Sequence, residues 1–312
     1  MAAPTIIRPQ AVYVGTTINA DALLDLAGNV EIRYTPEVLI KEPPTWIPPG
    51  AAKGKEFAEI RIPFYITSRM DTETKDIPWS NILKTLPLET TETWSGTAAP
   101  YTFESAEYDI TQNPSNNTTT LYIVEGGYAR KYTNCKVSSL TISKEAGQYL
   151  RCEATILGLY DSIAEQSTLP GLTTLPNHVS LDMTHNTGSF GEGYVFHTAS
   201  LTINPTLAER PAPDAAPYIT DWRATGVEIV IESDIEADAS AWETKIKNSI
   251  GSTVTFDFNW GSIDIGGSKT VSTKLKGVLE SYDEADREGI RVWSYRLRVV
   301  WDDTAKIFLK IA

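Results

Sequence analysis

KYTNCKVSSLTISKEAGQYLRCEATILG, residues 131–158, has the pattern of one long β-hairpin. Residues 144–147 supply its turn. The return arm alternates apolar and polar side chains: Leu150, Arg151, Cys152, Glu153, Ala154, Thr155 and Ile156. A period of two is typical of a strand with one face in the core and the other in solvent. The stretch therefore predicts a half-buried antiparallel sheet.

The pattern returns near the C-terminus as KLKGVLESYDEADREGIRVWSYRLRVVW, residues 274–301, with a predicted turn at residues 283–289. When the two stretches are aligned, Leu150 corresponds to Trp293 and Ile156 corresponds to Val299. The polar positions of this second return arm are Ser294, Arg296 and Arg298. Few identities connect the two stretches, but both have the same alternation and the same turn-flanked layout.

The elements predicted before each hairpin also follow one order. Each predicted helix has one tryptophan near its start: Trp79 in the first, and Trp242 in the second, where Ser240 and Glu243 form a capping box. A Val-Glu-Ile triplet within a β-branched run precedes each helix. Such a repeat predicts a mainly β protein made of two similar β-sandwich or barrel units, each with one flanking α-helix and a long closing hairpin.

The expected boundaries follow from the repeat. The first β unit is predicted at residues 1–160 and the second at residues 187–312. Residues 161–186 contain two prolines and many Ser and Thr, which indicates a linker or a long loop.

Composition limits the classes of function. The chain has 312 residues, 41% of them hydrophobic, and a net charge of -13. This excess of acidic groups disfavours tight wrapping around nucleic acid phosphates, but it is compatible with a surface along which DNA passes without sticking. No segment has the charge and apolar run of a signal peptide or the length of a membrane span. We therefore expect synthesis in the cytoplasm and no membrane partner.

Two cysteines lie in the organising hairpin. Cys135 and Cys152 are spaced so that the two arms could bring them nearly opposite each other. A disulfide is one interpretation, and two small buried thiols in a reducing compartment are the other.

Residues 41–56, KEPPTWIPPGAAKGKE, are expected to form an extended surface loop. Four prolines exclude a central strand or a helix from this stretch. Trp46 and Ile47 offer apolar area near its middle. We expect these two side chains to contact a neighbouring subunit.

Signals for catalysis or metal binding are weak. The three histidines, His178, His185 and His197, have no zinc-site spacing around them, and no nucleophile elbow, phosphate loop or dinucleotide fingerprint occurs in a strand-to-helix context. The sequence therefore predicts no catalytic, cofactor-binding or metal-binding residues. A β-sandwich carbohydrate-active enzyme remains open, because a glycosidase needs only two suitably spaced carboxylates.

Residues 132–142 together with residues 150–158 resemble the tail tube proteins of long-tailed bacteriophages. The resemblance lies in the run Val137, Ser139–Ser143 and in the return strand Ala154–Gly158. It implies a structural virion protein whose hairpins line a tube, that binds other tail proteins, and that needs no cofactor. Rings of six domains are usual in that family, so a duplicated chain would close a ring with three copies.

The resemblance also suggests which residues face the passing double-stranded DNA. The polar positions of the two return arms are the lumen candidates: Arg151, Glu153, Thr155, Ser294, Arg296 and Arg298. A distal tail, baseplate or host-recognition protein is the alternative, because it could use exposed aromatics such as Trp46 and Trp94 for binding.

Overall fold

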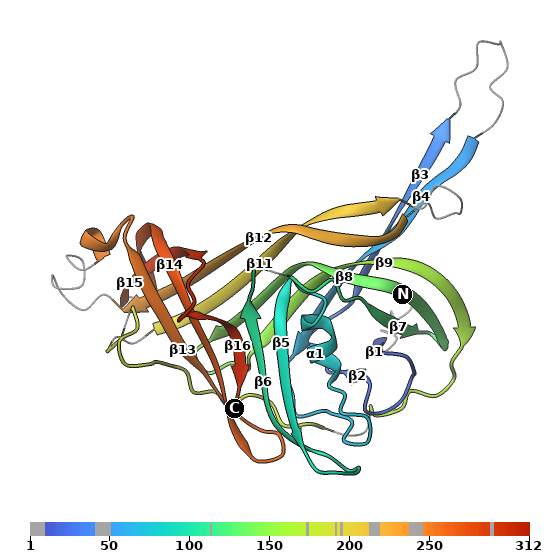
Figure 1. Ribbon diagram of the computed structural model, residues 1–312, viewed down its shortest axis with the longest axis horizontal. Helices are drawn as coiled ribbons and strands as arrows, with labels where there is room; N and C mark the ends of the chain where they lie inside the picture. The colour runs from blue at the N-terminus through green and yellow to red at the C-terminus, as the bar shows by residue number, and fades with distance from the viewer. Residues whose placement is uncertain are drawn as a thin grey trace, which may run out of the picture.

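Figure 1 shows the computed structural model, in which antiparallel strands make up most of the chain. The structure describes residues 10–40, 51–112, 114–172, 175–190, 192–193, 196–211, 219–236, 246–287 and 290–312. The predicted mainly β fold is confirmed. Helical structure in these ranges is limited to α1 (Pro78–Leu83) and residues 246–249.

The strands are long and follow one another closely. Those before residue 166 are β1 (Gln10–Val14), β2 (Leu23–Leu24), β3 (Glu31–Ile40), β4 (Ala51–Tyr65), β5 (Leu88–Ser95), β6 (Thr102–Ile110), β7 (Thr119–Glu125), β8 (Tyr128–Glu145) and β9 (Arg151–Glu165). Those after it are β10 (Thr184–His185), β11 (Phe196–Pro211), β12 (Ile219–Glu236), β13 (Thr253–Asp264), β14 (Ser268–Arg287), β15 (Ile290–Val300) and β16 (Lys306–Ile311).

The strands fall into two half-sheets. The N-terminal half-sheet has the spatial order β3-β4-β9-β8-β7-β1, and every neighbouring pair is antiparallel. The C-terminal half-sheet has the order β11-β12-β15-β14-β13-β10, again antiparallel throughout. In both, a helical segment follows the second strand of the outer hairpin, and a Gly-Gly turn precedes the long closing strand.

Two contacts join the half-sheets into one 16-stranded sheet. Residues 198–203 of β11 pair with residues 140–145 of β8, at the point where β7 no longer covers that edge of β8. The hairpin β5–β6, which has no counterpart in the described part of the C-terminal half-sheet, reaches across and pairs with β16. The chain is therefore held together by backbone hydrogen bonds at two places.

One hydrophobic core lies against the inner face of both half-sheets. Pro at the first helical position favours the start of α1, and the buried side of this helix covers the core face of the N-terminal half-sheet. Trp79 is fully enclosed, and its Nε1 donates a hydrogen bond to the carbonyl oxygen of Thr67 at 2.9 Å. Two smaller apolar clusters, around Tyr13 and around Trp222, are buried outside this core, and polar side chains occupy the opposite face along β9 and β15.

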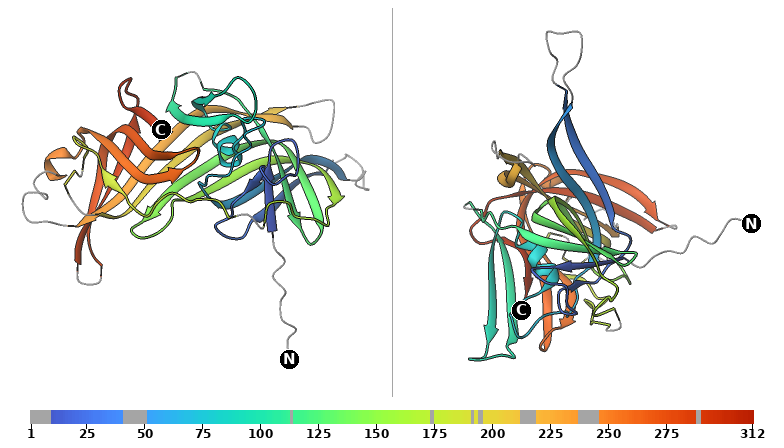
Figure 2. Two further views of the ribbon diagram at one scale, coloured as in Figure 1. Left: turned by 90° about the horizontal axis from the view of Figure 1, so that it is seen from below. Right: turned by 90° about the vertical axis from the view of Figure 1, so that its right-hand side faces the viewer.

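The hairpin β3–β4 projects from the body as an arm at one end of the molecule (Figures 1 and 2). Its strands pair as far as Ile40 with Ala51. The loop expected at residues 41–56 is therefore too long by six residues, because residues 51–56 belong to β4. Trp46 and Ile47 lie outside the described residues.

The hairpin predicted at residues 131–158 is confirmed as β8 and β9, but two details are wrong: β8 continues through Glu145, so the turn begins at residue 146 rather than 144, and the two cysteines are not opposite each other. Cys152 lies opposite Ile142, while Cys135 lies in an irregular segment of β8 where the register with β9 shifts between Thr133 and Lys136. Both thiols are buried and free. Burial raises the pKa of each thiol well above its usual value, because a thiolate would lose its hydration.

The second hairpin is β14 and β15, and its predicted turn begins too early. β14 continues through Asp283 to Arg287, which pairs with Ile290. Acidic residues at positions 283 and 286 resemble a turn in the sequence, but cross-strand pairing overrides this local preference. No helix in the described ranges is long and apolar enough to span a membrane.

A polar sheet face and two open edges

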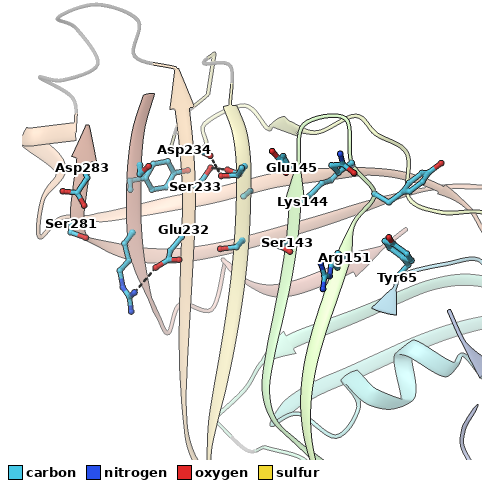
Figure 3. Close-up of a pocket in the computed structure, with 18 residues that line it drawn as sticks. Tyr65, Ser143, Lys144, Glu145, Arg151, Glu232, Ser233, Asp234, Ser281 and Asp283 are labelled. Carbon is cyan, nitrogen blue, oxygen red and sulfur yellow. Dashed lines mark hydrogen bonds and ion pairs between the residues drawn. The ribbon is translucent and has the colours of Figure 1, made fainter. Parts of the chain in front are cut away.

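The six lumen candidates all lie on the face of the sheet that points away from the core. Along β9 and β15 they alternate with buried positions, which is the alternation of polar and apolar side chains predicted from the sequence. Arg151, Ser294 and Arg296 line one hollow of about 760 Å³, shown in Figure 3. Glu153 and Thr155 line a second, smaller hollow toward the arm. The structure thus places both return arms on one continuous surface.

Each arginine among these candidates has a carboxylate partner. Arg151 lies 3.6 Å from Glu153. Arg296 contacts Glu232 at 2.9 Å and Glu280 at 3.3 Å. These guanidinium groups are consequently paired with protein carboxylates, which weakens their attraction for an external phosphate.

Arg298 is held in the same way, and the pairing reaches across three strands. Arg298 on β15 contacts Glu228 of β12 at 3.1 Å and Glu280 of β14 at 2.8 Å. Glu280 therefore bridges Arg296 and Arg298, and the ion pairs form a network rather than isolated contacts. Exposed networks of this kind contribute little stability, about 1 kcal/mol or less for each pair, but they fix the charge pattern of the surface.

Carboxylates outnumber arginines on this face in the described part of the chain. In the two hollows and the ion-pair network the carboxylates are Glu31, Glu59, Glu145, Glu153, Glu228, Glu232, Asp234, Glu280 and Asp283, and the basic residues are Arg33, Arg61, Lys144, Arg151, Arg296 and Arg298. The face is thus well hydrated and carries a small excess of negative charge. An excess of acidic groups disfavours tight contact with nucleic acid phosphates.

Lys144 is a structural residue that the sequence pattern did not reveal. It follows the polar-face residue Ser143, and its Nζ is directed to backbone carbonyl oxygens of Ser180, Asp182 and Trp260, at 2.8 Å in the case of Asp182. Burial lowers the pKa of its ammonium group to about 8. A lysine at an inward strand position was the available signal, because such a residue needs partners in the interior.

The three histidines are separated by the fold. His185 is packed edge-on against Phe256 and Phe258. Burial lowers the pKa of His185 to about 4, although the charge of Asp257 acts in the opposite direction. His197 lies near Glu236, and His178 stacks on Tyr149. Within the described residues, no cluster of three or more His, Cys, Asp or Glu side chains could hold a metal ion.

Two strand edges are open at opposite ends of the molecule (Figure 1). In the described part of the chain, β3 pairs only with β4, and residues 280–287 of β14 pair only with β15. Tyr34 on β3 is 45% exposed, and Ile32 is half-buried at the margin of the core. Open edges with apolar side chains are templates for pairing with another strand.

The described residues thus form a long antiparallel sheet with an ion-paired polar face and two open edges. The family model for phage tail tube proteins matches residues 19–286, and the chain belongs to that family. It is a structural component of a bacteriophage tail. No curated protein matches the chain.

Proposed function

We propose that the chain polymerises into the tail tube and that three copies form one ring, each contributing two similar β domains, at residues 1–160 and 187–312. The supporting observation is the strand order. Six strands follow the same antiparallel order in each half-sheet, with the helical segment and the Gly-Gly turn at matching places. A duplicated tube domain accounts for this repetition, and a ring of six domains then needs three chains.

In this proposal the polar face lines the channel through which double-stranded DNA is delivered. The lumen residues are Arg151, Glu153, Thr155, Ser294, Arg296 and Arg298. Their arginines are neutralised by neighbouring carboxylates, so the wall lacks bare positive charge that would hold phosphates. Three chains at -13 each give -39 per ring. Weak like-charge repulsion keeps the DNA hydrated and mobile.

The role is structural rather than catalytic, and it involves no cofactor. The chain is made in the host cytoplasm, stacks ring on ring, and meets other tail proteins at the two ends of the tube. We also propose that Trp46 and Ile47, which follow β3 and precede β4 in the sequence, contact a neighbouring subunit; the projection of the arm β3–β4 from the body (Figure 1) supports this.

Electron microscopy of the purified full chain tests the proposal. We expect stacked rings with three chains, six similar domains and a central channel lined by β9 and β15. Rings of six chains, particles without a channel, or a channel of strongly positive potential would each contradict a part of it. Glycan binding by isolated particles, or turnover of a sugar substrate, would instead support a host-recognition protein or an enzyme.

A further inference from the structure

We infer that β3 of one chain pairs with the open edge of β14 in the next chain, in the register that places Arg33 opposite Asp283. This inference rests on the proposed ring and adds the strands and the residue pairs that close it. It is drawn from the junction that the chain already contains between its own half-sheets.

The first step is an alignment of the two half-sheets based on their irregularities. The register of β8 with β9 shifts at three places, the last of them between Val137 and Ser139, and the register of β14 with β15 shifts once, between Leu279 and Ser281. If the two bulges are equivalent, Ser139 corresponds to Ser281. Bulges are reliable markers because each occupies a fixed place in its sheet.

The outer hairpins follow from this alignment through their paired residues. In the N-terminal half-sheet, Ser139 pairs with Thr155, which pairs with Arg61 on β4. In the C-terminal half-sheet, Ser281 pairs with Arg296, which pairs with Glu232 on β12. Arg61 pairs with Glu31 of β3, and Glu232 pairs with Ser200 of β11. Glu31 and Ser200 are therefore equivalent positions.

An independent feature agrees with the alignment. Five residues beyond Glu31 is Pro36, and five residues beyond Ser200 is Pro205. Both prolines are paired members of their hairpins, opposite Glu56 and Val227. Proline is uncommon inside paired strands, so its coincidence at one position supports the equivalence.

The internal junction then serves as the template. On the polar face, Thr202 of β11 lies opposite Thr141 of β8, and their hydroxyl oxygens are 3.0 Å apart. On the core face, Ile203 lies opposite Leu140. All of this occurs on the edge of β8 that corresponds to the open edge of β14.

Transferring this register to the open edges produces two adjacent complementary pairs, whereas the pair transferred from Leu201 and Ile142 sets Ile32 opposite Glu284, which is ion-paired with Arg291 in its own chain. Thr202 corresponds to Arg33 and Thr141 to Asp283, so a positive and a negative side chain meet on the polar face. Ile203 corresponds to Tyr34 and Leu140 to Tyr282, so two aromatic rings meet on the core side. Directly opposed ion pairs and aromatic pairs both favour antiparallel pairing.

Exposure supports the same partner. Leu201 and Ile203 are fully buried at the internal junction. Of their counterparts, Ile32 is half-buried and Tyr34 is 45% exposed. The open edges lie at opposite ends of the molecule, which is the arrangement that heterologous ring contacts require (Figure 2). A second copy of the chain is therefore the occupant that these edges fit.

Charge reversal tests the ion pair in the full chain. We expect R33D and D283R each to raise the protein concentration needed for half-maximal assembly at least tenfold, and the double variant R33D/D283R to restore most of it. R130D is the matched control, because Arg130 pairs with Glu125 on β7 and lies away from both edges. Single variants that assemble like the parent, or a double variant as defective as the worse single one, would overturn the register.

Cysteine cross-linking tests the register without relying on charge, because both native cysteines are buried. In assembled rings, R33C/D283C should form a disulfide between chains at least tenfold faster than R33C/S281C, which places the thiol two residues away on the same face. If rings of three chains form but the first pair does not cross-link, the inference is wrong and the proposed function stands. If the parent forms no ring of three chains, both are wrong.

Discussion

β11 and β3 begin the two half-sheets in the same way, but only β11 has a strand on its outer side. β11 is covered by β8, and its apolar residues Leu201 and Ile203 are completely buried. β3 is bare on that side in the described part of the chain, and Tyr34 remains 45% exposed. One junction is completed within the chain, and in our inference the second is completed by another copy.

The two half-sheets also differ in how firmly they are joined to what lies beside them. Within the chain, the junction of β8 with β11 is reinforced by the pairing of β6 with β16 and by the hairpin β11–β12, whose Trp222 packs on Phe57 of β4. The inferred junction between chains would have only the pairing of β3 with β14 and contacts made by the arm β3–β4. A firm internal junction and a weaker external one would let monomers fold completely before they assemble.

The largest expected effect on stability comes from substituting Leu201 of β11, and the comparison is with its counterpart Ile32 of β3. Leu201→Ser removes a fully buried side chain and places a hydroxyl in the core, so we expect a loss of about 3 to 4 kcal/mol of unfolding free energy. Its counterpart Ile32→Ser should cost about 1 kcal/mol, because Ile32 is only half-buried. Chemical denaturation of the monomers measures both.

Although Ile32→Ser should destabilise the monomer less than Leu201→Ser, we expect it to have a strong effect on assembly. Ile32→Ser should abolish ring formation under conditions in which the monomer is folded, as followed by sedimentation. An equal loss of monomer stability in the two variants would show that the two edges are not equivalent.

The two outer hairpins, β11–β12 and β3–β4, provide the second test. Trp222→Ala should reduce the free energy of unfolding by about 3 kcal/mol, because the ring is 1% exposed and lies 5.9 Å from Phe57 between centroids. W46S/I47S should leave monomer stability within about 0.5 kcal/mol of the parent and weaken polymer formation. If the double variant polymerises like the parent at equal concentration, the arm has no role in assembly.

The third test concerns a residue present in only one half-sheet. His185 has a pKa lowered from 6.5 to about 4 by burial, so the folded state favours the neutral ring. The stability that this provides is complete above pH 6.5 and is lost as the pH falls from 6.5 toward 4. The loss is at most about 3 kcal/mol. His185→Asn should remove this part of the pH dependence, as measured by denaturation at pH 7 and pH 4.5.

Much of the fold can be predicted from the sequence because strand alternation is local. Arg151 and Ile156 show their opposite faces in the residue pattern alone, and the burial of β9 agrees. Register between distant strands is different. A period of two cannot distinguish alignments that differ by two residues, so the pattern pairs Thr155 with Arg298 where the bulges pair it with Arg296.

The candidate site was predictable in part for the same reason. The polar positions of both return arms follow from alternation, but their partners Glu228, Glu232 and Glu280 come from other strands and are fixed only by tertiary pairing. The junction of β8 with β11 joins segments about 60 residues apart, with no turn between them to specify it. The open edges could not be recognised until that junction was known.

The smallest effect on stability should come from the ion pairs of the polar face, which also test whether this face lines the channel. E228Q/E232Q/E280Q removes the carboxylates that hold Arg296 and Arg298. Because these pairs are exposed, we expect a loss of about 1 kcal/mol or less and normal tubes. The freed arginines should then attract phosphate, so tubes of this variant should retain short double-stranded DNA at low salt and release it as salt rises, whereas parent tubes should not bind it. E104Q/E192Q/E209Q is the charge-matched control, because it removes the same number of carboxylates from outside this ion-pair network. Equal DNA retention by the two triple variants would show that net charge, rather than the polar face, determines how DNA meets the tube.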